Sequence, residues 1–238
     1  MGLNSRNILL AGASGLVGGL TLRRLLEHRD FSGSVFAPVR RELAISDSRL
    51  TAMKTDFTPA NTDSLFGDVL GSHPALRLDA YVSCLGSTIR AAGSREAFIA
   101  VDRDLVLRLA QTAFQQGARH AVLVSSVGAS RQSGTFYLRV KGEIEDALEA
   151  MGFERLDILQ PGLLLGARVE HRPGEALARA LAPLGNLALL GKLRRFRAIE
   201  ADSVARAIVR LLEFDAPGRF VHENDSMHDL AGDRGDLT

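Results

Sequence analysis

Two side chains with acid–base chemistry, Tyr137 and Lys141, lie four positions apart in the segment TFYLRVKGEIEDALEA. If this segment is helical, both side chains lie on the same face. A lysine ammonium close to a phenol favours the phenolate, so Tyr137 can act as a general acid or base on a carbonyl/alcohol pair. The spacing arises by chance on many helices, although the chain has only two tyrosines. The alternative is a half-buried aromatic ring beside a surface lysine.

A pair of hydroxyls, Ser125 and Ser126, ends the apolar run AVLVSS that precedes this segment. Open α/β sheets bind their ligands at the carboxyl ends of the strands. One of these serines can therefore hydrogen-bond a substrate carbonyl. The alternative is that both only satisfy backbone groups at the end of a strand.

Three glycines, Gly12, Gly15 and Gly18, follow the apolar run NILL and open a helical pattern. In this context the first allows a sharp turn, the second lets a pyrophosphate approach the backbone, and the third lets the helix pack on the strand. The free N–H groups of the first helical turn then face the phosphates, and Ser14 can add a hydroxyl. The alternative is a tight corner without a ligand.

The nature of the cofactor is indicated by the residues after the second apolar run, SVFAPV. Arg40 and Arg41 follow it directly, and Glu42 comes one step later. An acidic residue at this point is typical of NAD sites, whereas an arginine holds the 2′-phosphate of NADP. The sequence therefore favours NADP(H) over NAD(H). The alternative is that the two arginines are a solvated strand end.

These residues are positioned by alternating strands and helices. Apolar runs predict strands at residues 7–10, 34–39, 50–55, 79–85, 121–126 and 155–159, and helical spacing predicts helices over 14–28, 95–116, 135–150 and 203–214. This alternation predicts an α/β fold with a doubly wound parallel sheet. We expect residues 1–238 to form a single nucleotide-binding domain, with 162–200 forming most of a small substrate-side annex.

Composition sets limits on location and partners. The chain is 46% hydrophobic and 24% charged, has a net charge of +1, and contains one cysteine, Cys84. There is no signal peptide, no apolar run long enough to cross a membrane, no histidine or cysteine spacing typical of a metal site, and no nucleic-acid motif. We expect a cytoplasmic protein with a small-molecule substrate and no metal, membrane or nucleic acid; a protein partner or a homo-oligomer stays open.

Several segments spread along the chain carry a resemblance to one family. They are CLGST (84–88), FIAVDRDLVL (98–107), SSVGAS (125–130), FYLRVKGE (136–143), QPGLLL (160–165), RPGEAL (172–177) and MHDL (227–230). Together with the glycine turn they resemble the short-chain dehydrogenase/reductase superfamily, and within it the Tat-interacting-protein-like atypical reductases.

The resemblance implies a Rossmann-type fold and an NADPH-type cofactor. It matches Tyr137 and Lys141 to the catalytic pair, and Lys141 also to the nicotinamide ribose. The cofactor positions that it matches are Gly12, Ser14, Gly15 and Leu16 for the pyrophosphate, Arg40 and Arg41 for the 2′-phosphate, Asp56 for the adenine, Leu85, Gly86 and Ser87 for the adenosine ribose, and Pro161 to Leu163 for the nicotinamide.

Two positions depart from well-characterised extended members. Val127 stands where those members often have the active-site serine or threonine, so Ser126 is the candidate here. Asp102 stands where they have an asparagine. The expected function is an NADP(H)-dependent oxidoreductase acting on a small carbonyl or alcohol. The alternatives are a non-catalytic NADPH-binding regulator that acts through a protein partner, and a sugar-nucleotide epimerase-like enzyme, against which the two arginines argue.

Overall fold

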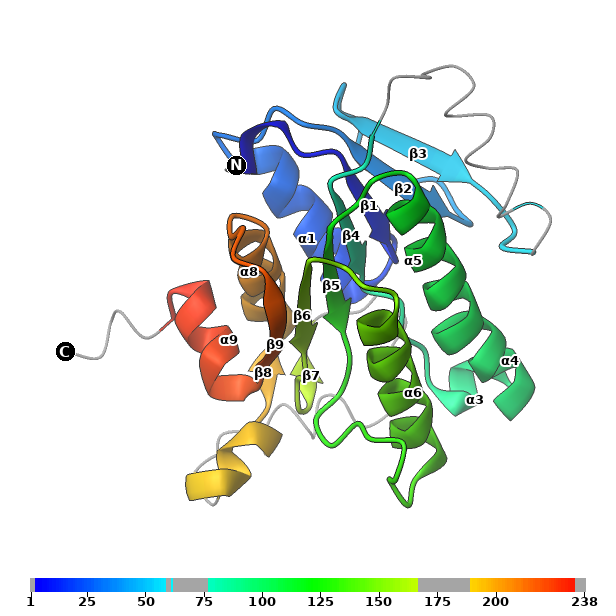
Figure 1. Cartoon of the computed structure of the whole chain (residues 1–238), viewed down its shortest axis with the longest axis vertical. Coiled ribbons are helices and arrows are strands. Elements are labelled where there is room, and N and C mark those ends of the chain that lie inside the picture. Colours follow the sequence, from blue (N-terminus) through cyan, green and yellow to red (C-terminus); the bar gives the residue numbers. More distant parts are fainter. Residues whose placement is uncertain (1–2, 59–60, 62–76, 167–188, 234–238) are drawn as a thin grey trace.

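A parallel sheet forms the centre of the molecule. The structure, a computed structural model, describes residues 3–58, 61, 77–166 and 189–233. Within them the sheet has seven strands in the order β3-β2-β1-β4-β5-β6-β9 (Figure 1). They are β1 (Ile8–Ala11), β2 (Val35–Val39), β3 (Leu50–Lys54), β4 (Ala80–Ser83), β5 (His120–Val124), β6 (Arg155–Leu159) and β9 (Gly218–His222). Every pairing is parallel, which confirms the predicted doubly wound, Rossmann-type fold.

The inner strands are buried along their whole length. Each residue of β1, β2, β4, β5 and β6 is buried, as continuous apolar runs covered on both faces should be. The edge strands β3 and β9 instead contain exposed residues.

Helices cover both faces of the sheet (Figure 1). One face carries α1 (Leu16–Glu27), α8 (Ala201–Leu211) and α9 (Asn224–Ala231). Leu22 and Leu25 of α1 share an apolar cluster with Ile208 of α8. The other face carries α3 (Ile89–Ala92), α4 (Arg95–Ile99), α5 (Val106–Gln115) and α6 (Phe136–Ala150), where Leu109 and Ile144 lie in a second cluster. The longer helices α1, α5, α6 and α8 each bury an apolar stripe.

The helix predicted over 95–116 is interrupted. Between α4 and α5 the chain forms a π-helical turn, η2 (Ala100–Leu105). Such a turn adds a residue to the helical repeat and is frequent at functional sites. A uniform helical repeat over 95–116 would place the apolar residues Phe98, Val101 and Leu105 on one buried stripe. The structure instead buries Asp102 and leaves Val101 half-buried.

The substrate-side annex predicted over 162–200 is described only in part, because 167–188, including RPGEAL, lies outside the described residues. The described part contains a short pair of parallel strands, β7 (Leu164–Leu165) and β8 (Ile199–Glu200), and the 3₁₀ helix η3 (Gly191–Phe196). None of these elements, nor α3, β9 and α9, was predicted from the sequence.

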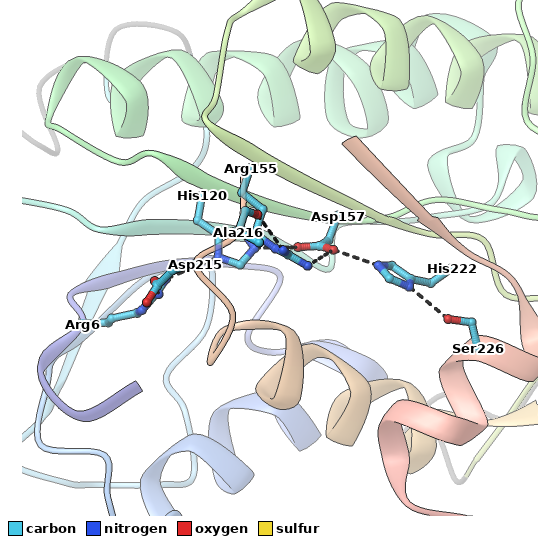
Figure 2. A network of polar contacts seen from close by, with 8 residues as sticks. All are labelled: Arg6, His120, Arg155, Asp157, Asp215, Ala216, His222 and Ser226. Atoms are coloured by element: carbon cyan, nitrogen blue, oxygen red, sulfur yellow. Dashed lines mark hydrogen bonds and ion pairs between the residues drawn. The ribbon is translucent and has the colours of Figure 1, made fainter. Parts of the chain in front are cut away.

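A buried network of polar side chains ties β5, β6 and β9 together (Figure 2). The carboxylate of Asp157 accepts hydrogen bonds from His120 Nε2 at 2.7 Å and His222 Nε2 at 2.8 Å. It also accepts from Arg155 Nε at 2.6 Å and Nη2 at 2.9 Å. Burial alone raises the pKa of Asp157, but these four bonds outweigh it and hold that pKa well below its usual range.

The two imidazoles of this network have defined tautomers. A carboxylate only accepts hydrogen bonds, so both Nε2 atoms carry their hydrogens toward Asp157. In the neutral rings, Nδ1 of His120 then accepts from Arg6 Nη1 at 3.3 Å, and Nδ1 of His222 accepts from the Ser226 hydroxyl at 3.1 Å. A proton on Nδ1 of His120 would face a guanidinium, so the structure favours the neutral ring.

Acid conditions should therefore weaken the fold through His120. Burial lowers the pKa of His120, and this outweighs the attraction of Asp157. Because the unfolded ring still takes up a proton near pH 6.5, the unfolded state binds more protons below that pH and stability falls as the pH falls. We expect the free energy of unfolding to decline by up to about 1.4 kcal/mol per pH unit between pH 6.5 and 5 from this residue. Urea denaturation across this range measures the slope.

The His120→Gln variant should flatten that slope. The matched control is His28→Gln, at the end of α1 and outside the network. An equal flattening in both variants would contradict the assignment to His120.

Candidate functional site

The site lies where the strand order reverses, between β1 and β4. At such a switch point the connections leave in opposite directions and open a crevice at the carboxyl ends of the strands. The loop that follows β1 begins at Gly12, and the loop that follows β4 runs through Cys84. The two are neighbours, since the Cys84 N–H donates to the carbonyl of Ala11 at 2.9 Å.

The three glycines of the first loop each meet neighbouring backbone. Gly12 has φ +85°, and a Cβ there would lie 2.8 Å from the carbonyl of Cys84. A Cβ on Gly18 would lie 2.1 Å from the carbonyl oxygen of Gly12, and one on Gly15 would lie 3.2 Å from it. The predicted turn is therefore present, and close approach of the chain to itself requires glycine at Gly12 and Gly18, whereas a side chain at Gly15 would be a tight fit.

The start of α1 suits an anion. Its N-cap, Gly15, provides no side-chain cap, and the first turn, which begins at Leu16, contains no acidic residue. Ser14 and Gly15 are exposed. The N–H groups of a first helical turn have no partner within the helix, so this end can hold a phosphate by backbone N–H groups and by the helix dipole. The loop and the helix end fit the pyrophosphate that the sequence predicts.

The residues predicted for the adenosine end follow β2 and β3. Arg40 and Arg41 come directly after β2 and are exposed. Asp56, also exposed, follows β3, and its carboxylate accepts from the Thr58 N–H at 2.9 Å and from Asn61 Nδ2 at 3.0 Å. Hydrogen bonding within this loop, first from the Thr58 backbone, lowers the pKa of Asp56. The Asp56 carboxylate thus orders its own loop, and its contact with an adenine stays a prediction.

The two residues predicted for proton chemistry lie on α6. Tyr137 is half-buried, and its ring centroid is 5.7 Å from that of Phe98. Lys141, one turn later, is 2% exposed. Its ammonium lies 3.3 Å from Asp102 Oδ1 and donates to the carbonyl of Leu85 at 3.5 Å. The alternative in which Lys141 is a surface lysine is therefore wrong, because its side chain is buried and ion-paired.

Asp102 connects this lysine to the loop after β4. Its carboxylate, 0% exposed, accepts from the Ser87 N–H at 3.0 and 3.1 Å and from the Ser87 hydroxyl at 2.5 Å. Gly86, between Leu85 and Ser87, is exposed. The three predicted ribose-loop residues therefore sit directly against the Lys141–Asp102 pair. The sequence had marked Asp102 only as a departure from the family pattern.

The structure separates the two serines at the end of β5. Ser125 is buried, and its hydroxyl donates to Glu145, which also accepts from Gln160 Nε2 at 3.0 Å through each oxygen. Ser126 is half-buried. Because the Ser125 hydroxyl is engaged inside the protein, Ser126 remains the candidate for a substrate carbonyl.

Glu145 is a residue that the sequence reasoning missed. It is buried on α6, four positions after Lys141, and burial raises its pKa despite the bonds from Ser125 and Gln160. The spacing Tyr137, Lys141, Glu145 was visible as a polar stripe along one helical face. It passed unnoticed beside the apolar stripe that includes Ile144.

The predicted nicotinamide loop follows β6. The carbonyl of Pro161 accepts from the Val127 N–H at 3.0 Å, so this loop lies beside the one that holds Ser126. Pro161 is buried, whereas Leu163 is 50% exposed. A Cβ on Gly162 would lie 2.5 Å from the carbonyl oxygen of Arg197. The loop thus runs between the end of the sheet and the substrate-side segment.

The described residues were compared with what a membrane span and a metal site require. In the described ranges, none of the helices is long and apolar enough to cross a membrane. The same part of the chain holds no group of three or more histidine, cysteine, aspartate or glutamate side chains that could bind a metal ion.

Comparison with known proteins places the chain in a family, although no family model matches it. It is 37% identical over 215 residues to the protein named "Protein fmp52, mitochondrial" of Aspergillus clavatus, covering 89% of this chain and 90% of the relative. It is 36% identical over 177 residues to protein HTATIP2 of Rattus norvegicus, covering 74% of this chain and 70% of that protein.

A solved structure supports the fold. The Bordetella bronchiseptica enzyme WbmH, in complex with NAD⁺, superposes with a TM-score of 0.65 at 16% identity, covering 96% of this chain and 80% of that one. At this identity the likeness concerns the fold alone.

The expected cytoplasmic location was wrong. The fungal relatives, from five further species as well as A. clavatus, carry "mitochondrial" in their names. The expectation rested largely on the single cysteine, and cysteine content does not distinguish one reducing compartment from another.

The relatives, the fold and the ordered series of matching segments all indicate the same family. The chain belongs to the family of the proteins named fmp52 and HTATIP2.

Proposed function

We propose that this protein is an NADP(H)-dependent oxidoreductase that interconverts a small carbonyl compound and its alcohol. One observation carries the proposal: Lys141 is a buried cation on the same helical face as Tyr137, and it touches the loop after β4 at the switch point of the sheet. Burying an ammonium is costly unless it is paired. A buried ammonium one helical turn from a phenol, at the switch point of the sheet, can stabilise the phenolate that proton transfer to a carbonyl leaves behind.

The cofactor residues are those of three loops. The turn that begins at Gly12 and the first turn of α1 would hold the pyrophosphate, and the loop at Gly86 would lie along the ribose. Arg40 and Arg41 would hold the 2′-phosphate, since a guanidinium binds phosphate through two parallel hydrogen bonds. A bound nicotinamide supplies or accepts the hydride.

The proton is handled by the protein. In the direction of reduction the Tyr137 hydroxyl donates its proton to the carbonyl oxygen, and the Lys141 ammonium stabilises the phenolate that remains. The Ser126 hydroxyl donates a hydrogen bond to the same oxygen and orients the substrate. In the direction of oxidation the phenolate accepts the proton of the alcohol.

The cofactor preference is tested by thermal unfolding with NADPH, NADH or neither. A ligand at about 100 times its dissociation constant stabilises the fold by roughly 2.7 kcal/mol, so NADPH should raise Tm clearly and NADH little at equal concentration. In the Arg40→Ala/Arg41→Ala variant we expect the Kd of NADPH to rise about tenfold or more, because bonds to charged groups contribute about 1.5–3 kcal/mol each. The Kd of NADH should not change.

The matched control removes two other exposed arginines, Arg23 and Arg29, and should leave both affinities as they are. Equal stabilisation by NADH and NADPH in the wild type would contradict the NADP(H) preference; NAD is the natural competitor, because WbmH holds NAD⁺. No stabilisation by either, in protein freed of copurified cofactor, would contradict the proposed function itself.

A further inference from the structure

The ion pair between Asp102 and Lys141 is one of the most enclosed charged contacts of the protein. Both side chains are buried, at 0% and 2% exposure, and their atoms approach to 3.3 Å. Of the acids in the described residues, only Asp102 forms an ion pair with Lys141. A charge in such surroundings has a long reach, because little water screens it.

The same carboxylate fixes the loop after β4. It accepts from both the N–H and the hydroxyl of Ser87, while Lys141 donates to the carbonyl of Leu85. A Cβ on Gly86 would lie 3.8 Å from the lysine Nζ and 3.9 Å from Asp102 Oδ1. The ion pair therefore lies directly under the loop that the proposed cofactor would cross.

The charges of this pair affect the phenol of Tyr137, which lies one helical turn from Lys141. An isolated Lys141 cation would favour the Tyr137 phenolate strongly. An anion 3.3 Å from that cation turns a single charge into a dipole, whose field at a third group is much weaker. The strength of the lysine's effect on Tyr137 thus depends on Asp102.

We propose that Asp102 is a positioning residue that sets how strongly Lys141 stabilises the Tyr137 phenolate and that holds the ammonium against the loop after β4. The proposal rests on the proposed role of Tyr137 in proton transfer. Asp102 touches neither the reacting carbonyl nor the phenol in this account; it acts through Lys141.

Other charged groups on the elements around Tyr137 have partners of their own. Besides Lys141 and Asp102, the charged residues of α4, η2 and α6 are Arg95, Glu96, Arg103, Asp104, Arg139, Glu143, Glu145, Asp146 and Glu149. Arg103 pairs with Glu143 at 3.1 Å, and Arg139 donates to two backbone carbonyls. Arg95 lies over the ring of Phe136, and Glu145 accepts from Ser125 and Gln160. The Lys141–Asp102 pair differs from these groups in that both of its side chains are buried and its lysine lies one helical turn from Tyr137.

The protein offers a direct spectroscopic test. It has two tyrosines and no tryptophan, so the rise of tyrosinate absorbance near 295 nm reports only Tyr81 and Tyr137. Tyr81 is fully buried and donates to the carbonyl of Val106, and burial raises its pKa far above the ordinary value. Tyr137 should therefore ionise first, and the Tyr137→Phe variant should lack that first step.

In this titration Asp102→Asn should lower the midpoint of the first step by about 1–3 pH units, because it leaves the lysine cation uncompensated beside the phenol. Lys141→Met should raise the midpoint, because it leaves the anion. The matched control is Asp104→Asn, which removes a half-exposed carboxylate of the same π-helical turn that pairs with Arg103; it should leave the midpoint unchanged.

A midpoint that is unchanged or raised in Asp102→Asn, or that is lowered equally in Asp104→Asn, overturns the proposal. If Asp102→Asn does not give a native circular-dichroism spectrum, the comparison passes to Lys141→Met against the double variant Lys141→Met/Asp102→Asn. The double variant should then ionise at lower pH than the single one, and equal midpoints overturn the proposal.

This titration requires no substrate, so its outcome is separate from that of the proposed function. A wild-type protein that reduces no carbonyl compound with NADPH, but shows the expected shift in Asp102→Asn, would count against the proposed function and for the electrostatic role of Asp102. Where turnover is measured, the alkaline fall of kcat/KM for reduction should move to lower pH in Asp102→Asn by the same amount as the absorbance midpoint.

Discussion

Replacing Tyr137 by phenylalanine should lower kcat/KM for carbonyl reduction by about 100-fold to 10,000-fold, the usual contribution of a positioned general acid. The change removes one hydroxyl and keeps the ring that packs 5.7 Å from the Phe98 ring centroid. NADPH affinity should stay within a factor of about two, because the phenol is assigned to the substrate and not to the phosphates. The measurement is the oxidation of NADPH followed at 340 nm across a panel of small aldehydes and ketones.

The other tyrosine provides the control. Tyr81→Phe loses only the hydroxyl that donates to the buried carbonyl of Val106, so its fraction of folded protein should turn over like the wild type. A Tyr137→Phe variant with activity within about threefold of the wild type would contradict the assignment. A wild type that binds NADPH but is as inactive as the variant on every substrate would favour the regulatory alternative.

Replacing Asp157 by asparagine should lower the free energy of unfolding by about 3–5 kcal/mol, the effect of breaking a buried charge pair from one side. The Arg155 guanidinium would keep its position, 6% exposed by residue, without the anion that now receives two of its hydrogen bonds. His120 and His222 would each face an amide that cannot accept from all of these donors at once.

The measurement is urea denaturation at pH 7, with a second series at acid pH. The lowered pKa of Asp157 means that its stabilisation is fully present above about pH 4, the unfolded value, and declines as the pH falls toward the folded value. Asp157→Asn should remove that part of the acid sensitivity. The control is Asp146→Asn, whose half-exposed carboxylate lies 3.7 Å from Arg131 and should cost less than about 1 kcal/mol. A loss of similar size in both variants would contradict the network's role.

The sequence contained enough to predict the sheet but not its last edge. The inner strands were all predicted because they are mostly apolar, although β6 (RLDIL) also buries Arg155 and Asp157. β9, with the sequence GRFVH, has an arginine and exposed positions, so nothing in its pattern separates it from a loop. The position of β9 is determined by its pairing with β6, for example of His222 with Leu159. A short stretch of sequence gives no indication of such long-range pairing.

The residues of the candidate site likewise divide into those that a local sequence pattern indicates and those that it does not. The glycine turn and the pair Tyr137 and Lys141 stand out in the sequence because their spacing is local, and their roles stay predictions. The burial of Asp102 against Lys141 was not predicted, because a uniform helical repeat places Val101 inward, whereas the π-helical turn buries Asp102. The engagement of Ser125 by Glu145 joins residues 20 positions apart, and no single-sequence pattern connects them. The cofactor preference and the adenine contact stay predictions.

The order of strands in the sheet also has a consequence for the growing chain. β6, whose residues are all buried in the finished protein, has β9 as its outer neighbour. On the ribosome β6 emerges well before residues 218–222, and during that interval its outer row of N–H and C=O groups is bare. Unpaired apolar strand edges are the surfaces through which chains stick to one another. Nascent chains whose synthesis stops before β9 should therefore aggregate or bind chaperones, because the strand that pairs with the outer edge of β6 is the last one to be synthesised.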